Sequence, residues 1–283
     1  MNYDNTQLIA KKSLSQNFLI NQQIIDKIAS KMELFVNKSG AEKIVEIGPG
    51  EGSLTELFLK WNKPVVALEI DQRAVELLQD KFTNQPNLEL KQIDATDFFA
   101  VNNNQTLEKI KPFTMLSNLP FNIGSRLLVD LAITCADVNF SVILQSEVAD
   151  KLTENNKHLT FFGCWIKSFW DISKIMTIAP CHFRPAPKVY ATLVEAESLF
   201  NKENWLFKLD SSQLIQARQI LKSVFSQPRK SLSSHLRLLG LNSIQSDSFY
   251  KQYSLTPNTR LTWENYNNVW QNIYTEITSN YEK

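Results

Sequence analysis

The sequence predicts an α/β protein, in which a mostly parallel, doubly wound sheet is followed by a smaller C-terminal all-α domain. Two observations support this prediction. Short apolar segments alternate with helical segments over the first two thirds of the chain, and this strand pattern stops after residue 198. Uninterrupted apolar strands that alternate with helices are typical of a parallel sheet covered by helices on both faces.

Six segments have the length and apolar character of strands, and most are separated by segments of helical periodicity. The predicted strands are 43–48, 64–70, 88–94, 114–119, 141–147 and 188–197. The last of them, KVYATLVEAE, alternates apolar and polar residues, which predicts an edge strand. Before the first strand, Asn21 is expected to cap a helix that carries apolar residues at helical spacing.

The chain after residue 198 has helical character throughout. Helices are expected at about 211–226, 230–239, 246–252 and 263–278. Gly240 follows the second of these as a C-terminal cap, and Thr262 precedes the last as an N-cap. We therefore predict two domains, residues 1–198 with an N-terminal arm over 1–20, and a helical domain over 199–283.

The composition is that of an ordinary globular protein. The chain has 283 residues, of which 43% are hydrophobic and 21% charged. No apolar run approaches the roughly 20 residues of a membrane span, and the N-terminus has no secretory signal, so we expect a cytoplasmic protein that does not enter a membrane. We separately expect it to be a monomer. The three cysteines lack paired spacing and the three histidines are scattered, so no metal site is expected.

A glycine-rich turn, VEIGPGEGSLT (45–55), follows the first predicted strand and opens a helix. Gly48, Gly50 and Gly52 allow a tight turn and a close approach of a ligand to the backbone. The GxGxG spacing differs from the dinucleotide pattern GxGxxG, and no Lys-Ser/Thr follows as in a phosphate-binding loop. Such a loop suits a nucleoside with a zwitterionic amino-acid tail, although glycines in this position also serve strand–helix packing alone.

Polar residues end the next three predicted strands. Glu69 lies about 20 residues after the glycine loop, where a carboxylate can accept hydrogen bonds from both ribose hydroxyls. Asp94 ends the third strand, where it can accept from an adenine amino group, and Asn118 ends the fourth. Because the carboxyl ends of parallel strands meet at one edge, we expect these side chains to converge. Glu69 alone would be interpreted as a surface carboxylate.

The fourth strand ends in Asn-Leu-Pro-Phe, residues 118–121, which is an unusual tip for a buried strand. Pro120 has no N–H to donate to a sheet. The tip combines an acceptor, a rigid turn and a flat apolar ring, which favours a clamp for a planar base. The alternative is a proline turn that ends the strand and buries Phe121.

These motifs carry a family resemblance. VEIGPGEGSLT, ALEID, QIDA and NLPF together resemble a Rossmann-like class I S-adenosylmethionine-dependent methyltransferase domain. More narrowly, they resemble the KsgA/RsmA family of rRNA adenine N6,N6-dimethyltransferases, which is related to the erythromycin-resistance rRNA methyltransferases. Four further segments match this family: KKSLSQNFL (11–19), LQSEVADKL (144–152), FRPAPKVYATLV (183–194) and FSQPRKSLSSHL (225–236). The resemblance covers residues 11–265.

The resemblance implies S-adenosyl-L-methionine as the cofactor and a set of residues that hold it. The implied cofactor-binding residues are Asn17, Leu19, Gly48, Gly50, Glu69, Asp94 and Asn118. Phe18, between the first two, is expected in the core.

The resemblance also implies how a target adenine is held. The Asn118 side-chain carbonyl and the Leu119 backbone carbonyl would accept the hydrogens of adenine N6. Pro120 would aim the Leu119 carbonyl, and Phe121 would stack on a flipped-out base. Three further residues are implied in substrate binding, Phe183 against the base and Arg229 with Lys230 against the RNA backbone.

The implied function is transfer of methyl groups to N6 of adenines in small-subunit (16S) rRNA, with dimethylation of two adjacent adenosines during ribosome assembly. The implied partner is rRNA in a small-subunit precursor, held by the helical domain through its basic stretch 208–237. Three alternatives remain open: 23S rRNA adenine methylation of the antibiotic-resistance type, a non-catalytic RNA-binding assembly or transcription factor on the same fold, and a small-molecule methyltransferase.

The sequence departs from the family pattern in three ways, all of which affect the expected binding of RNA and none of which affects the site of the methyl donor. HLTFF (158–162) stands where the family has Tyr-Gly-Arg-Leu-Ser, Pro228 replaces a basic residue, and the net charge is only +1. These departures leave open which RNA is bound.

Overall fold

The computed structural model divides the chain into two compact units. It describes residues 8–101, 107, 109–153, 159–200, 202, 204–226 and 230–281. The first unit takes its described residues from 1–150 and 170–198, and the second from 151–169 and 199–283. The predicted boundary after residue 198 coincides with one junction, but residues 151–169 belong to the second unit rather than the first.

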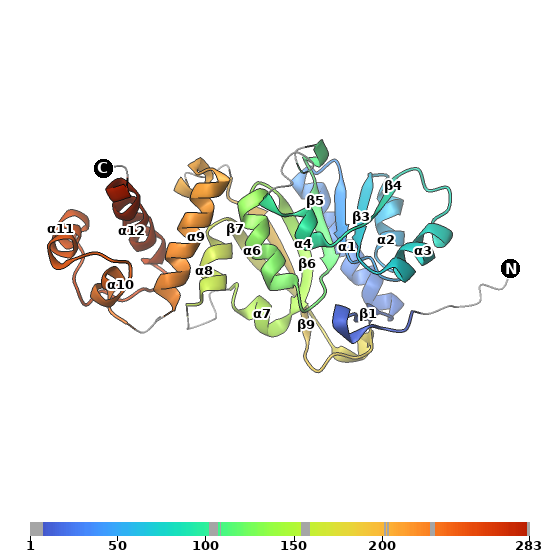
Figure 1. The fold of residues 1–283 in the computed structure, drawn as a ribbon. Helices are drawn as coiled ribbons and strands as arrows, with labels where there is room; N and C mark the ends of the chain where they lie inside the picture. The colour runs from blue at the N-terminus through green and yellow to red at the C-terminus, as the bar shows by residue number, and fades with distance from the viewer. Residues whose placement is uncertain are drawn as a thin grey trace. The chain divides into compact units, whose positions relative to one another are not determined.

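A seven-stranded sheet forms the centre of the first unit, in the order β4-β3-β2-β5-β6-β9-β7 (Figure 1). Its strands are β2 (Ile44–Ile47), β3 (Val65–Glu69), β4 (Leu88–Gln92), β5 (Thr114–Asn118), β6 (Asn139–Gln145), β7 (Trp170–Ile178) and β9 (Ala191–Ser198). Strands β2 to β6 pair in parallel, whereas β9 pairs antiparallel with both β6 and β7. The predicted mostly parallel sheet is thus confirmed.

The edge of this sheet differs from the prediction. The segment 188–197 was predicted as the edge strand, but β9 lies between β6 and β7, and β7 is the edge. Within β7 only the two terminal residues are buried, so this strand lacks the apolar run that identifies the others in the sequence. A second, two-stranded sheet joins β1 (Phe18–Leu19) to β8 (Phe183–Arg184).

Helices cover both faces of the large sheet. The first unit contains α1 (Gln22–Ser39), α2 (Thr55–Phe58), α3 (Gln72–Lys81), α4 (Ala95–Phe98), α6 (Gly124–Thr134) and α7 (Ser146–Asp150), with short 3-10 turns at Lys12–Leu14, Leu59–Trp61 and Pro180–His182. Buried residues of α1 and α2 pack on one face, and α4 and α6 cover the other (Figure 1). As predicted, Asn21 caps α1, because its side chain accepts from the Ile24 N–H at 3.1 Å.

The second unit is helical. It contains α8 (Phe161–Lys167), a 3-10 turn (Trp205–Lys208), α9 (Ser211–Phe225), α10 (Leu232–Leu238), α11 (Ser243–Tyr253) and α12 (Tyr266–Tyr281). The ring centroids of Trp165 and Trp205 lie 5.8 and 5.1 Å from that of Trp270. Trp165 belongs to α8, so this aromatic core explains why residues 151–169 fold with the C-terminal helices. The last helix begins at Tyr266 rather than at the predicted residue 263.

The described residues contain neither a candidate membrane span nor a candidate metal site. No helix there has the length and apolar character needed to span a membrane. No group of three or more His, Cys, Asp or Glu side chains there could hold a metal ion. Of the three cysteines, Cys135 and Cys164 are buried and Cys181 is exposed.

Candidate active site

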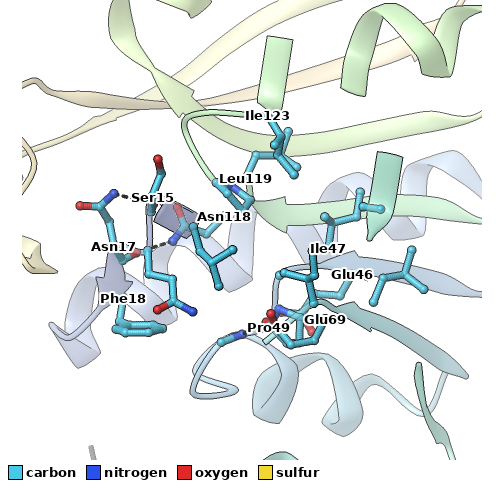
Figure 2. Close-up of a pocket in the computed structure, with 18 of the residues that line it drawn as sticks. Ser15, Asn17, Phe18, Glu46, Ile47, Pro49, Glu69, Asn118, Leu119 and Ile123 are labelled. Atoms are coloured by element: carbon cyan, nitrogen blue, oxygen red, sulfur yellow. Dashed lines mark hydrogen bonds between the residues drawn. The ribbon is translucent and has the colours of Figure 1, made fainter. Parts of the chain in front are cut away.

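A cavity of about 280 Å³ lies at the carboxyl ends of β2, β3 and β5, and we call it the strand-end cavity (Figure 2). Its walls are the glycine loop, the ends of the strands and the N-terminal arm. All the residues that the sequence suggested for the cofactor line it: Asn17, Leu19, Gly48, Gly50, Glu69, Asp94 and Asn118. The structure therefore brings together residues up to 101 positions apart in the chain.

The glycine loop requires glycine for two reasons. Gly48 and Gly50 have φ angles of +62° and +57°, in the left-handed region that favours glycine. A Cβ atom on Gly50 would lie 2.9 Å from Cε1 of Phe18, and one on Gly48 would lie 3.3 Å from Cγ of Pro120. The loop thus packs directly against both the N-terminal arm and the tip of β5.

Glu69, at the end of β3, holds the glycine loop in place. Its Oε2 accepts from the Gly50 N–H at 3.1 Å and its Oε1 accepts from the Asp71 N–H at 2.9 Å. Only 4% of the residue is exposed. Burial raises the pKa of this carboxyl, while the two N–H donors act in the opposite direction. Since each carboxylate oxygen has a second lone pair, Glu69 can still accept from a ligand.

Asp94 uses one oxygen to start a helix and leaves the other for a ligand. Its Oδ1 caps α4 by accepting from the Thr96 N–H and the Thr96 hydroxyl, both at 2.8 Å. Among the described residues, Oδ2 has no hydrogen-bond partner. The side chain lines the strand-end cavity, where this oxygen suits an amino group.

Asn118 carries a buried acceptor without a partner. Its Nδ2 donates to the backbone carbonyl of Asn17 at 2.9 Å (Figure 2). A carbonyl oxygen only accepts, so this bond determines which way the amide points. The side-chain oxygen Oδ1 is buried and has no hydrogen-bond partner in the described part of the chain. Such an acceptor costs about 1–3 kcal/mol, which points to a ligand donor at this position.

The rest of the Asn-Leu-Pro-Phe tip forms a fixed turn. The Pro120 carbonyl accepts from the N–H groups of Ile123 and Gly124, both at 3.1 Å, and so leads into α6. The Leu119 side chain is buried, and no described residue donates to its carbonyl. Phe121 is half-buried and lines the strand-end cavity.

Phe121 also lines a second cavity of about 790 Å³, which we call the outer cavity. Asn17 lies in the walls of both cavities, and Pro185 and Pro187 line the outer one. Phe183, which the sequence suggested as a second contact to the base, does not reach either cavity. Its ring is 2% exposed and packs in the core, because Phe183 pairs with the buried Leu19 between β1 and β8. Phe183 is therefore not among the residues of this segment that face the outer cavity, which are Arg184, Pro185, Pro187, Lys188 and Val189.

Of the two basic residues that the sequence suggested for binding the RNA backbone, the structure describes only Lys230. Lys230 is exposed just before α10, in the second unit. Arg229 lies outside the described residues.

Sequence reasoning missed Glu46 in β2. It is 2% exposed, lines the strand-end cavity and accepts from the Thr55 hydroxyl at 2.7 Å. Burial raises the pKa of Glu46 to about 8, with a smaller contribution from the charge of Glu69. The available signal was a single acid inside the apolar strand IVEI.

The fold and the strand-end cavity define a class I methyltransferase domain: a parallel sheet with a glycine loop after the first strand and acidic residues at the next two strand ends. Solved structures share this fold. A dimethyladenosine transferase from Plasmodium falciparum has a TM-score of 0.62 at 18% identity, over 94% of this chain and 97% of that one. The 23S rRNA methyltransferase ErmE has a TM-score of 0.61 at 19% identity, over 93% and 100%.

The chain belongs to the ribosomal RNA adenine dimethylase family, whose model matches residues 8–278. It is 33% identical to "Ribosomal RNA small subunit methyltransferase A" of Sulfurihydrogenibium sp. (strain YO3AOP1), over 82% of this chain and 86% of the relative. It is 29% identical to the protein of the same name from Wigglesworthia glossinidia brevipalpis, over 93% and 97%. The family resemblance inferred from the motifs is confirmed.

Gly50→Ala tests the packing of the glycine loop against Phe18. The variant should lose about 1–2 kcal/mol of unfolding free energy through left-handed strain, and about 1–3 kcal/mol more through the clash with the ring. Gly40→Ala is the matched control, because Gly40 has φ +67° but no atom within 4 Å of its Cβ position. Urea denaturation measures both variants, and equal losses would contradict this packing.

Glu46→Gln tests the raised pKa of Glu46. In the unfolded chain this carboxyl ionises near its ordinary pKa of 4.5, but in the folded chain only near 8. Its contribution to stability is therefore present below about pH 4.5 and lost as the pH rises through 8. The variant should show a smaller decline in unfolding free energy between pH 5 and 8, whereas the exposed-site control Glu42→Gln should keep the wild-type slope. A wild-type slope in Glu46→Gln would show that this carboxyl titrates normally.

Proposed function

We propose that this protein transfers methyl groups from S-adenosylmethionine to N6 of adenines in 16S rRNA, dimethylating two adjacent adenosines during assembly of the small ribosomal subunit. The observation that supports the proposal is the buried Oδ1 of Asn118, which has no hydrogen-bond partner among the described residues and lies in a cavity lined also by Glu69 and Asp94. Membership of the ribosomal RNA adenine dimethylase family and the names of the relatives support the same reaction and substrate class.

The residues of the strand-end cavity fit S-adenosylmethionine. Glu69 suits the two ribose hydroxyls, and the Oδ2 atom of Asp94 suits an adenine amino group. The buried carboxyls of Glu46 and Glu69 favour a cationic ligand when they are ionised. The bound donor would supply an electrophilic methyl group on a sulfonium. The glycine loop, held by Glu69, would let the ligand approach the backbone at Gly48.

The tip of β5 would activate the target nitrogen. The lone pair of adenine N6 is delocalised into the ring, so this nitrogen is a weak nucleophile until it becomes more tetrahedral. Acceptors aimed at its two hydrogens favour that geometry and stabilise the positive charge that develops on it. Asn118 Oδ1 and the Leu119 carbonyl are available for these hydrogens. The methylated nitrogen is positively charged and loses its proton readily, so the protein needs no dedicated general base.

The outer cavity and Phe121 would receive the target base. A base that stacks on an aromatic ring gains about 1–3 kcal/mol, which offsets part of the cost of flipping it out of a helix. Both cavities share Phe121 and Asn17, so a base in the outer cavity would adjoin the donor. This proximity would supply much of the rate enhancement.

The helical domain would hold the RNA backbone. Lys208, Lys222, Lys230 and Arg237 are exposed in the basic stretch 208–237 of the second unit. Basic side chains of this kind bind phosphates and make affinity salt-dependent. We expect the protein to act as a monomer in the cytoplasm, where small-subunit precursors assemble.

The decisive experiment incubates the protein with small-subunit particles that lack adenine dimethylation, together with labelled S-adenosylmethionine, and maps the modified nucleotides by mass spectrometry. Label on N6 of two adjacent 16S adenosines is expected. Label on 23S rRNA would instead indicate the antibiotic-resistance type of enzyme. A protein without transfer activity and without heat of donor binding in calorimetry would be a non-catalytic RNA-binding factor.

Asn118→Ala tests the acceptor role. Turnover should fall about 100-fold or more, because one preorganised group that stabilises the developing charge is removed. The equilibrium affinity for the donor, measured by calorimetry, should change far less. Asn268→Ala, at an exposed position of α12, is the control and should turn over normally. Normal turnover in Asn118→Ala would exclude Asn118 from the mechanism.

Glu69→Gln tests the ribose contact. The amide has one acceptor oxygen instead of two and no charge, so the dissociation constant for the donor should rise about tenfold or more. Glu89→Gln, on an exposed residue of β4, is the control. An unchanged dissociation constant in Glu69→Gln would show that Glu69 only supports the glycine loop.

A further inference from the structure

The N-terminal arm forms one wall of the strand-end cavity, and its polar contacts converge on a carboxylate that the cavity itself does not contain. Residues Ser13 to Leu19 of the arm all line the cavity. The carboxylate is Asp71, between β3 and α3. We propose that Asp71 is a positioning residue, which holds the arm over the strand-end cavity through hydrogen bonds from Lys11 and Gln16 and, through the arm, orients the amide of Asn118. We call these bonds of Asp71 with Lys11 and Gln16 the latch. The consequences for methyl transfer rest on the proposed function, whereas the latch itself does not.

Asp71 is buried and bonded on both oxygens. Only 2% of the residue is exposed. From the arm, Lys11 Nζ donates to Oδ1 at 3.1 Å and Gln16 Nε2 donates to Oδ2 at 2.9 Å. From α3, Arg73 donates to both oxygens, through Nε at 3.1 Å and Nη2 at 2.6 Å. One carboxylate thus joins two points of the arm to the helix that follows β3.

The charges around Asp71 keep this latch formed at neutral pH. The Arg73 guanidinium, with Gln16 and Lys11, holds the pKa of Asp71 well below its usual range despite burial. A desolvated carboxylate is strongly unfavourable without its partners. Departure of the arm would break the bonds from Lys11 and Gln16 and leave Asp71 with Arg73 as its partner, so these two bonds favour the docked arm.

Further contacts tie down the start of the arm. The Leu8 N–H donates to Oε1 of Glu51 at 2.8 Å, and Arg184 Nη2 donates to the same oxygen at 2.6 Å. Arg73 Nη1 also donates to the Ile9 carbonyl at 3.2 Å. Asp71 is therefore the site at which the middle of the arm, from Lys11 to Gln16, is fixed.

The latch is connected to the acceptor that the reaction needs. Gln16, which is bonded to Asp71, is followed directly by Asn17. The Asn17 carbonyl accepts from Asn118 Nδ2 and thereby directs Oδ1 away from the arm. If the arm left the cavity, this bond would be lost and the amide of Asn118 would be free to rotate. An intact latch should therefore slow the release of the donor and increase turnover.

Asp71 also caps α3, since its Oδ1 accepts from the Arg73 N–H at 3.4 Å, and the test must separate the two roles. Asp71→Ser keeps a good helix cap but has neither the charge nor the length to bind Lys11 and Gln16. The double variant Lys11→Ala/Gln16→Ala removes both bonds from the arm to Asp71 and leaves the cap intact. It also removes the bond from the Lys11 N–H to Gln16 Oε1, so the Lys11 amide is left out of the comparison of exchange rates. Lys27→Ala, at an exposed position of α1, is the control.

Two measurements decide the proposal. Hydrogen exchange of the backbone amides of residues 8–17 is measured without donor, and the dissociation rate of S-adenosylmethionine is measured by stopped flow. Both latch variants should exchange these amides about tenfold faster and release the donor about tenfold faster than the wild type and Lys27→Ala. Combining Asp71→Ser with the double variant should add little to either rate, because each variant alone already removes the bonds that Lys11 and Gln16 donate to Asp71.

Wild-type exchange and donor release in Lys11→Ala/Gln16→Ala would overturn the proposal and leave Asp71 as a helix cap alone. Failure of the proposed function is a different outcome. A wild-type protein that binds no donor would refute the methyltransferase assignment, while amide exchange in the arm would still support or overturn the latch.

Discussion

The parallel pairing of β3 with β2 and β4 is the constraint on which the candidate site depends. Parallel strands bring their carboxyl ends to one edge, and here the ladder continues past the strands themselves. The Gly48 N–H donates to the Leu68 carbonyl, and the Ile93 N–H donates to the Glu69 carbonyl, both at 2.9 Å. These bonds satisfy backbone groups that would otherwise be unpaired and set the positions of the glycine loop, Glu69 and Asp94 relative to one another.

The strand-end cavity contains several buried polar groups whose burial destabilises the folded chain when no ligand is bound. Two carboxyls, Glu46 and Glu69, are buried with raised pKa values, and Asn118 Oδ1 has no partner among the described residues. Each of these groups loses hydration that it had in the unfolded chain. They are held in place by the packed core beneath them and by hydrogen bonds from Thr55, Gly50 and Asp71. This combination is expected where a polar ligand completes the site.

The second unit explains one departure from the family sequence. The segment HLTFF differs from the Tyr-Gly-Arg-Leu-Ser stretch that the family resemblance led us to expect, and its described residues lead into α8. Thr160 caps this helix by accepting from the Gly163 N–H at 3.0 Å, and the Phe161 ring lies 6.4 Å from that of Trp165. Thr160 and Phe161 thus help to build the aromatic core of the helical unit, a structural role that does not require RNA.

Local sequence determined which elements form and which residues stand at the strand ends. Apolar runs, glycines and caps act within a few positions of the chain, so six of the seven strands of the large sheet, the cap at Asn21 and the convergence of Glu69, Asp94 and Asn118 could be predicted. Only tertiary structure decided that β7 is the edge strand of the large sheet, that Phe183 is buried against Leu19, and that the buried Glu46 lines the strand-end cavity. The bond between Asp71 and the arm, 55 to 60 positions away in the chain, is of the same kind. Such contacts depend on strand register and long-range packing, which leave no periodic signal in the sequence.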